Sequence, residues 1–402
     1  MLGKRRIYLD FAAATPMDRQ VRRAVTKSLK EDFGNPSAPH GEGRRARASV
    51  EKARIAVARS LSVKPEEIVF TSGGTEANNL AIRGLAEGLR ARGAKFSDLH
   101  FVTSTIEHSS LIETFRMLEK EGASVSWVSP GSDGVITPES VLKALKKKTA
   151  LISLAHVNSE IGTIQPIAAI GAALIIYDKD NISTLKKFAP EAHFPLLHAD
   201  AAQSPLYLDA GPHVLKADLV SYDAQKIMGP KGVGILFRNF SIPLAPIMGG
   251  GTQERGLRPG TENVSAIVGA GVAFQLAKEG RGKREEYVRK LRDYLIALVR
   301  KKIPEAELIG SEKKRIANNA CFSVSGADGD YLSVLMDKEG VAVTPRSACM
   351  GSGGEVSHVV LALTGDQKKA RGTIRFSLWP RTREKDIEKA VSILARVIKI
   401  AR

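Results

Sequence analysis

Residues 67–76 read Glu-Ile-Val-Phe-Thr-Ser-Gly-Gly-Thr-Glu, an apolar run that leads into two glycines and then into a helical pattern. A buried strand, a tight turn and a helix form the unit from which parallel α/β sheets are built. The turn also offers free backbone N–H groups at the positive end of a helix, an arrangement that attracts an anion. The stretch therefore predicts a parallel α/β domain with an anion seat at one strand end.

Further apolar runs follow along the chain, and helical patterns separate them. Near-continuous apolar runs are typical of strands in a parallel sheet that is covered on both faces. We expect a three-layer α/β domain whose ligand lies beyond the carboxyl ends of its strands. The polar stretch 177–193 is interpreted as a surface insertion. The other predicted strands are 98–103, 150–155, 195–199 and 218–221.

The pattern changes after Gly260. Two long helical stretches lead to a strand at 319–324, and a second strand at 372–377 precedes a last helix with an apolar stripe. This succession predicts a smaller α+β domain. The expected boundaries are 15–260 for the large domain, and 1–14 with 261–402 for the small one.

Composition is that of a folded protein: 402 residues, 43% apolar and 26% charged, enough for two domains. The two cysteines, Cys321 and Cys349, are too few for a disulfide scaffold or a cysteine-rich metal site, so we expect no metal. The first residues lack the apolar core of a secretory leader. The longest apolar stretch, 164–177, is shorter than the roughly 20 residues of a membrane helix. We expect a soluble cytoplasmic protein.

The chain has 60 basic and 43 acidic residues, a formal charge of +17. Such an excess favours anionic partners, and RNA is the first to consider. The basic residues occur in short scattered runs without interleaved aromatic residues, and no nucleic-acid-binding module is recognisable. A solvated basic surface is therefore the favoured interpretation, and direct nucleic-acid binding is not expected.

Two polar residues follow predicted strands. Asp200 comes directly after an apolar run, where a carboxylate serves a ligand more often than a core, with capping as the alternative. Lys226 lies in a short loop among apolar neighbours; a desolvated lysine readily forms a Schiff base, with a surface lysine as the alternative. An anion seat, a carboxylate and such a lysine together are what pyridoxal phosphate requires. The combination predicts a pyridoxal phosphate site.

Ordered motifs extend this pattern over nearly the whole chain. They are Tyr8-Leu-Asp-Phe-Ala-Ala-Ala-Thr-Pro16, Gly34-Asn-Pro-Ser37, Thr71-Ser-Gly-Gly-Thr-Glu76, Glu107-His108, His156-Val-Asn-Ser-Glu-Ile-Gly162, His198-Ala-Asp-Ala-Ala-Gln203, Lys226-Ile-Met-Gly-Pro-Lys-Gly232, residues 249–261, Ser347-Ala-Cys349 and Ile374-Arg-Phe-Ser377. In these motifs the chain resembles the class V aminotransferase family, specifically its cysteine desulfurases of the NifS/IscS type.

The resemblance implies fold type I of the pyridoxal-phosphate-dependent transferases and a homodimer. It also implies a reaction in which L-cysteine gives L-alanine and an enzyme-bound persulfide. That sulfur would pass to an acceptor protein, such as an Fe–S cluster scaffold or a tRNA-thiolation enzyme.

The resemblance further implies a role for each site residue. Lys226 would hold the cofactor as a Schiff base, Asp200 would pair with its pyridine nitrogen, and His108 would stack on its ring and transfer protons. Arg375 would clamp the substrate carboxylate, because a planar two-pronged donor suits that task. The other implied ligands are Gly74 and Thr75 for the phosphate, helped by Thr261 of the other subunit, Asp223 and Gln225 beside it, Gln203 for the ring hydroxyl, and Asn158 for both the hydroxyl and the substrate.

Cys349 is the residue that selects the reaction. It lies in a Gly-rich segment, and a desulfurase needs a thiolate that attacks the substrate sulfur and carries the persulfide to an acceptor. The Ser-Ala-Cys form resembles the long-loop branch of the family. Cys321, inside an apolar run, is interpreted as a buried structural residue.

Two residues depart from the family pattern. Ser and His commonly stand three residues and one residue before the lysine, where this chain has Asp223 and Gln225. A carboxylate about 4 Å from a phosphate charge costs roughly 4 kcal/mol at an effective dielectric constant of 20. We therefore expect Asp223 to turn away from the phosphate.

Two alternatives remain open. One is another reaction on the same cofactor, namely that of a selenocysteine lyase or a class V transaminase; Cys349 argues against the transaminase. The other is a non-enzymatic basic scaffold or RNA-associated protein with a weakened cofactor site, suggested by Asp223 and the charge of +17.

Overall fold

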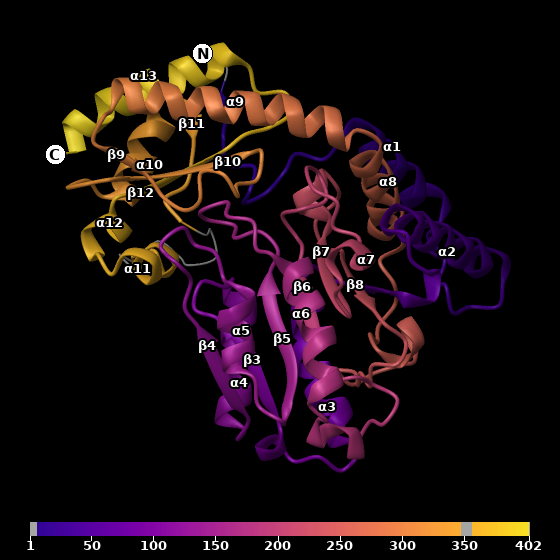
Figure 1. Ribbon diagram of the computed structural model, residues 1–402. Helices are drawn as coiled ribbons and strands as arrows, with labels where there is room; N and C mark the ends of the chain where they lie inside the picture. The colour runs from indigo at the N-terminus through magenta and orange to yellow at the C-terminus, as the bar shows by residue number, and fades with distance from the viewer. Residues whose placement is uncertain (1–5, 347–355, 402) are drawn as a thin grey trace.

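The structure, a computed structural model, describes residues 6–346 and 356–401. Its central element is a seven-stranded sheet in the order β2-β8-β7-β6-β5-β3-β4 (Figure 1). Five neighbouring strands, from β7 to β4, pair in parallel, whereas β8 runs antiparallel to both β7 and β2. The strands are β2 (Ile68–Thr71), β3 (His100–Ser104), β4 (Ser124–Val128), β5 (Thr149–Ala155), β6 (Leu196–Asp200), β7 (Leu219–Asp223) and β8 (Gly234–Arg238).

Apolar side chains alternate between the two faces of this sheet. Leu151 and Leu196 pack on the face covered by α3 (Gly74–Arg90) and α4 (Ser109–Lys120). Their chain neighbours Ile152 and Leu197 pack on the opposite face. That face is covered by α2 (Gly41–Leu61), α6 (Ile167–Asp180) and α8 (Val264–Glu279), with α1 (Arg19–Glu31) against α8. The predicted three-layer α/β fold is thereby confirmed.

A second, smaller sheet is built from the C-terminal part of the chain. Its antiparallel order is β12-β10-β9, and Ile387, Val391, Leu394 and Ile398 form the predicted buried stripe of the last helix. The elements are α9 (Arg281–Lys302), β9 (Ala306–Leu308), β10 (Asn319–Val324), α10 (Gly329–Lys338), β11 (Val341–Ala342), α11 (His358–Thr364), α12 (Gln367–Arg371), β12 (Thr373–Ser377) and α13 (Glu384–Ala401).

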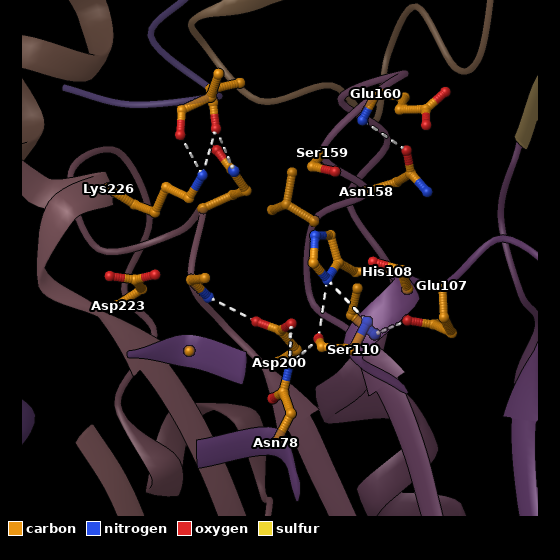
Figure 2. A pocket seen from close by; sticks show the side chains of 18 of the residues that line it. Asn78, Glu107, His108, Ser110, Asn158, Ser159, Glu160, Asp200, Asp223 and Lys226 are labelled. Atoms are coloured by element: carbon orange, nitrogen blue, oxygen red, sulfur yellow. Dashed lines mark hydrogen bonds between the residues drawn. The ribbon is translucent and has the colours of Figure 1, made fainter. Parts of the chain in front are cut away.

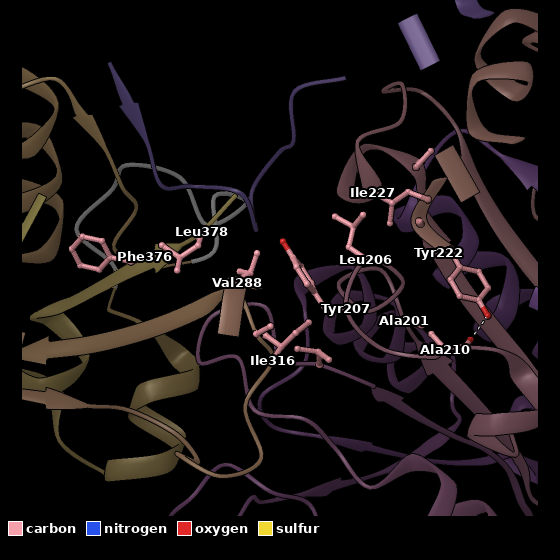
Figure 3. Close-up of a cluster of buried hydrophobic side chains, with 14 of the residues drawn as sticks. Ala201, Leu206, Tyr207, Ala210, Tyr222, Ile227, Val288, Ile316, Phe376 and Leu378 are labelled. Carbon is pink, nitrogen blue, oxygen red and sulfur yellow. Dashed lines mark hydrogen bonds between the residues drawn. The ribbon is translucent and has the colours of Figure 1, made fainter. Parts of the chain in front are cut away.

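The N-terminal strand joins this C-terminal part. Strand β1 (Ile7–Tyr8) pairs in parallel with β11, while α8 packs against α1 and α2. One apolar core continues across both parts, and Figure 3 shows Leu206 and Ile227 of the first part with Val288 and Phe376 of the second. The predicted domain boundaries stay a prediction.

The stretch 177–193 differs from expectation. Helix α6 extends to Asp180, and Leu185, Ala189 and Ala192 are fully or almost fully buried in the core beneath α3 and α4. The interpretation as a surface insertion is therefore wrong for these residues. Leu185 lies in a short 3-10 turn (Thr184–Lys187), and Ala189 and Ala192 lie in the irregular segment that follows, so no regular spacing in the sequence indicated their burial.

Among the described helices, none combines the length and apolarity that a bilayer crossing requires. In the same residues, no group of three or more His, Cys, Asp or Glu side chains is arranged to hold a metal ion.

Candidate active site

A pocket lies where β5, β6 and β7 end, at the position predicted for the ligand (Figure 2). Its volume is about 980 Å³, including solvent at its mouth. Thr261 is exposed and does not line this pocket, and Cys349 lies outside the described residues. The predicted residues that line it are Gly74, Thr75, His108, Asn158, Asp200, Gln203, Asp223, Gln225, Lys226 and Arg375.

Lys226 presents its amine to the pocket from a short turn directly after β7. Its Nζ donates hydrogen bonds to the carbonyl oxygens of Ala12 (2.9 Å) and Ala13 (2.5 Å), as Figure 2 shows. The N-terminal segment is fixed in turn, because Thr15 Oγ1 donates to the carbonyl of Gln225 over 2.6 Å. The amine is therefore held at a defined place by a segment remote in sequence.

Asp200 ends β6, and neutral donors orient its carboxylate. Oδ2 accepts from Asn78 Nδ2 over 2.9 Å, and Oδ1 accepts from the backbone N–H of Ala202 over 3.0 Å. Asn78 is buried in α3, one turn after Gly74, so both residues face the pocket. Asn78 was not singled out from the sequence, although its i+4 spacing from Gly74 could have indicated it.

His108 is connected to Asp200 through a chain of hydrogen bonds. Asn78 Nδ2 also donates to Ser110 Oγ over 2.9 Å, and Ser110 Oγ lies 2.9 Å from His108 Nδ1. The backbone N–H of Ser110 donates to the same Nδ1 over 3.1 Å. Nδ1 is therefore an acceptor, and the neutral imidazole carries its proton on Nε2.

Glu107 is a fully buried carboxyl group in the pocket wall. It accepts hydrogen bonds from Ser104 Oγ and, over 2.8 Å, from the backbone N–H of Ala155, so it ties the ends of β3 and β5 together. Burial raises the pKa of Glu107 to about 7, and the nearby charge of Asp200 acts in the same direction. A role for Glu107 could not be predicted from the sequence, because its burial follows from packing.

This raised pKa makes stability depend on pH. Between pH 4.5 and about 7 the unfolded chain releases a proton that folded Glu107 retains, so the Glu107 contribution to the free energy of unfolding falls as pH rises, by up to about 3 kcal/mol. Burial lowers the pKa of His100, His156 and His198, and this raises the free energy of unfolding over the same pH range in every variant. In urea unfolding at pH 5 and pH 8, the parent should therefore gain less stability than Glu107→Gln, by the Glu107 contribution. Glu113→Gln, on the exposed side of α4, should change with pH as the parent does. The same pH dependence in Glu107→Gln as in the parent would contradict the assignment.

Arg375 reaches the pocket from the small sheet and is almost fully buried. Nη2 donates to Asp10 Oδ1 over 2.9 Å, and Nη1 donates to the carbonyl of Ser159 over 2.8 Å. Its Nε is buried and has no hydrogen-bond partner among the described residues. A guanidinium held in this way can bind a carboxylate in a defined orientation.

The side-chain amides of Asn158 and Gln203, both predicted ligands, form hydrogen bonds within the protein. Asn158 Oδ1 accepts from the backbone N–H groups of Glu160 and Ile161, and its Nδ2 donates to the carbonyl of Ile106 over 2.7 Å. Gln203 Nε2 donates to the carbonyl of Ala12 over 3.0 Å. These bonds shape the pocket wall, and each Nδ2 or Nε2 carries a second proton for a ligand.

Asp223 does not turn away from the anion seat, so that expectation is wrong. The residue is 7% exposed and lines the pocket, and a Cβ built on Gly74 would lie 3.4 Å from its Oδ2. The reason is local, because Oδ1 caps the turn by accepting from Gln225 N (3.1 Å) and Oδ2 accepts from Gln225 Nε2 (3.0 Å). These bonds hold the carboxylate beside the first turn of α3.

Comparisons with known proteins agree with this geometry. A cysteine desulfurase IscS of Dictyoglomus turgidum is 39% identical over 98% of this chain and 95% of its own. A cysteine desulfurase IscS of Stutzerimonas stutzeri is 38% identical over 98% of this chain and 92% of its own. Among solved structures, a NifS-like protein has a TM-score of 0.86 and 32% identity, covering 98% of this chain and all of its own. A NifS-like protein from Rickettsia africae has a TM-score of 0.83, 25% identity and coverage of 98% and 99%.

The family model of class-V aminotransferases matches residues 7–390, nearly the whole chain. Together with these relatives, this match confirms the resemblance found in the sequence motifs. The chain belongs to the class-V aminotransferase family, among proteins of the NifS/IscS type.

Proposed function

We propose that the protein is a cysteine desulfurase, which takes sulfur from L-cysteine and leaves L-alanine. The observation that carries this proposal is one pocket in which the Lys226 amine, the Asp200 carboxylate and the Arg375 guanidinium converge. Relatives named cysteine desulfurase, similar over almost the whole chain, support it.

The pocket residues fit pyridoxal phosphate, the cofactor of this family. Asp200, already oriented by Asn78, would pair with the pyridine nitrogen, and Lys226 would bind the aldehyde carbon. The first turn of α3 offers backbone N–H groups to the phosphate, and the missing side chain of Gly74 leaves them accessible. Asp223 would oppose the phosphate charge, and Gln225 would supply a donor beside it. When bound, the cofactor supplies an electron sink for the substrate carbons.

The chain's own groups then divide the remaining tasks. Arg375 binds the substrate carboxylate, and the Lys226 amine, at the Ala12 and Ala13 carbonyls, moves protons at the substrate carbons. His108 would hold a proton on Nε2 for transfer, while Ser110 fixes Nδ1. Cys349, outside the described residues, is proposed as the nucleophile that receives the sulfur.

We further propose a cytoplasmic homodimer that delivers sulfur to an acceptor protein. The exposed position of Thr261, outside its own chain's pocket, supports a role at the phosphate site of a second subunit. An Fe–S scaffold or a tRNA-thiolation enzyme is the proposed acceptor, and direct nucleic-acid binding is not part of the proposal.

The test uses purified protein with pyridoxal phosphate, L-cysteine and a reductant. We expect sulfide and alanine in equal amounts. Sulfide release from L-cysteine should also be faster than any transfer of an amino group. A preference for L-selenocysteine would indicate the lyase, and amino transfer without sulfide would indicate a transaminase. A colourless protein that borohydride does not label and that elutes with RNA would favour the scaffold.

The charge of Asp223 should weaken cofactor binding. A carboxylate about 4 Å from the phosphate costs roughly 4 kcal/mol, nearly three decades of affinity, of which the Gln225 donors and the helix end offset part. Asp223→Ser and the isosteric Asp223→Asn should therefore lower the dissociation constant at least about tenfold. Titration of the apo-protein with pyridoxal phosphate measures this.

The matched control for Asp223 is the same change at Asp200, which ends the neighbouring strand β6. Asp200→Asn should weaken binding, because it removes the charge that pairs with the pyridine nitrogen. Unchanged affinity in both Asp223 variants would mean that the carboxylate leaves the phosphate site once the cofactor binds.

A further inference from the structure

His358 lines the same pocket, although no motif or spacing in the sequence indicated it. It is the first residue of α11, and the side chain of Ser357 caps that helix through the N–H of Val360. Ser357 Oγ also donates to Glu160 Oε2 over 2.6 Å. The start of α11 is thereby fastened to the wall of the pocket, and the position of the His358 ring is defined.

The hydrogen bonding of His358 fixes its tautomer. Its Nε2 lies 3.0 Å from the carbonyl oxygen of Glu107, which can only accept, so Nε2 carries the proton. In the neutral ring Nδ1 is then an acceptor. Nδ1 is buried and has no hydrogen-bond partner among the described residues. Buried polar atoms in native proteins are nearly always paired, so this nitrogen points to a donor that a ligand brings.

Only one group of the proposed substrate suits this acceptor. The carboxylate of L-cysteine accepts hydrogen bonds and is matched to Arg375, and the amino group goes to the cofactor carbon bound by Lys226. The thiol remains, and its S–H is a weak donor. Ile106 and Val359, which pack in one apolar cluster beside His358, also line the pocket and suit a sulfur atom.

We propose that His358 Nδ1 accepts the S–H hydrogen of the substrate and orients its sulfur, which makes His358 a positioning residue that selects for a thiol. This inference rests on the proposed function. It predicts that His358 contributes to the binding of L-cysteine and contributes nothing to the binding of an analogue in which a methyl group replaces the thiol.

The experiment compares L-cysteine with L-2-aminobutyrate on the holo-protein in a Cys349→Ala background, where sulfur is not removed. The readout is the dissociation constant, from the cofactor absorbance. His358→Leu should weaken L-cysteine about threefold to tenfold and leave L-2-aminobutyrate within about twofold. His358→Asn, whose Oδ1 can replace Nδ1 as acceptor, should recover part of the loss.

Equal weakening of both ligands would show a structural role only and would overturn the inference. So would unchanged binding of L-cysteine in His358→Leu. If the parent binds L-2-aminobutyrate but not L-cysteine, the proposed function fails together with the inference. If the parent binds both ligands and the His358 variants leave both dissociation constants unchanged, only the inference fails.

Discussion

Replacement of Lys226 by alanine should lower kcat for sulfide release from L-cysteine by about 10⁴-fold or more. Among the described residues that line the pocket, Lys226 is the only lysine. Without its amine nothing in that set can bind the cofactor carbon covalently, and the Ala12 and Ala13 carbonyls lose the group that they hold. Arginine at position 226 should not restore activity, because a guanidinium stays protonated.

The matched control for this substitution is Lys231→Ala. Lys231 follows in the same motif, five residues later, but it is exposed and does not line the pocket. Its loss should leave kcat within about twofold. Borohydride reduction followed by peptide mass spectrometry should place the cofactor label at position 226 in the parent and nowhere in Lys226→Ala. More than about one hundredth of the parent activity in Lys226→Ala, or a label on another lysine, would refute the assignment.

The strands and helices that position Lys226 could largely be predicted from apolar periodicity. Strands β5, β6 and β7 are buried on both faces, and such strands leave a continuous apolar run in the sequence. Strand β4 was missed because it lies at the sheet edge, where four of its five residues are only half buried. Strand β8 was missed because it begins at Gly234, directly after a glycine-rich turn.

The sequence predicts those parts of the candidate site in which the residue type itself indicates the chemistry, such as a lysine amine or a carboxylate at a strand end. Lys226 and Asp200 each follow a predicted strand, and the ends of such strands meet at one edge of a parallel sheet, so the sequence alone predicts that the two residues lie together. The partners that orient them could not be predicted in this way. Their place in the site depends on the packing of α3, α4 and α11 around one pocket, which brings together Asn78, Ser110 and His358.

Asp223 shows a different limit of the sequence argument. Charge repulsion from a phosphate suggested that its carboxylate would turn away. In the structure the carboxylate instead accepts hydrogen bonds from its nearest donors, the backbone N–H and the side-chain amide of Gln225. Such a cap, two residues along the chain, costs little entropy, because it forms within a turn that is already closed.

The two cysteines of the chain should respond oppositely to substitution. Cys321 lies in β10, fully buried in an apolar cluster, and burial raises the pKa of its thiol to about 12. At neutral pH it stays a thiol, which is a poor nucleophile. Cys349, whose segment is outside the described residues, is the remaining candidate for sulfur transfer.

Cys349→Ala should therefore lower sulfide and alanine production at least about 100-fold, whereas Cys321→Ala should keep kcat within about threefold. Because Lys226, Asp200 and Arg375 are untouched, Cys349→Ala should still change the cofactor absorbance when L-cysteine is added, and this separates substrate binding from sulfur transfer. Iodoacetamide should modify position 349 and spare position 321 in the native protein. Sulfide output from Cys349→Ala equal to that of the parent would show that Cys349 does not transfer sulfur. Cys321 could not have replaced it, because its thiol is buried and has a raised pKa.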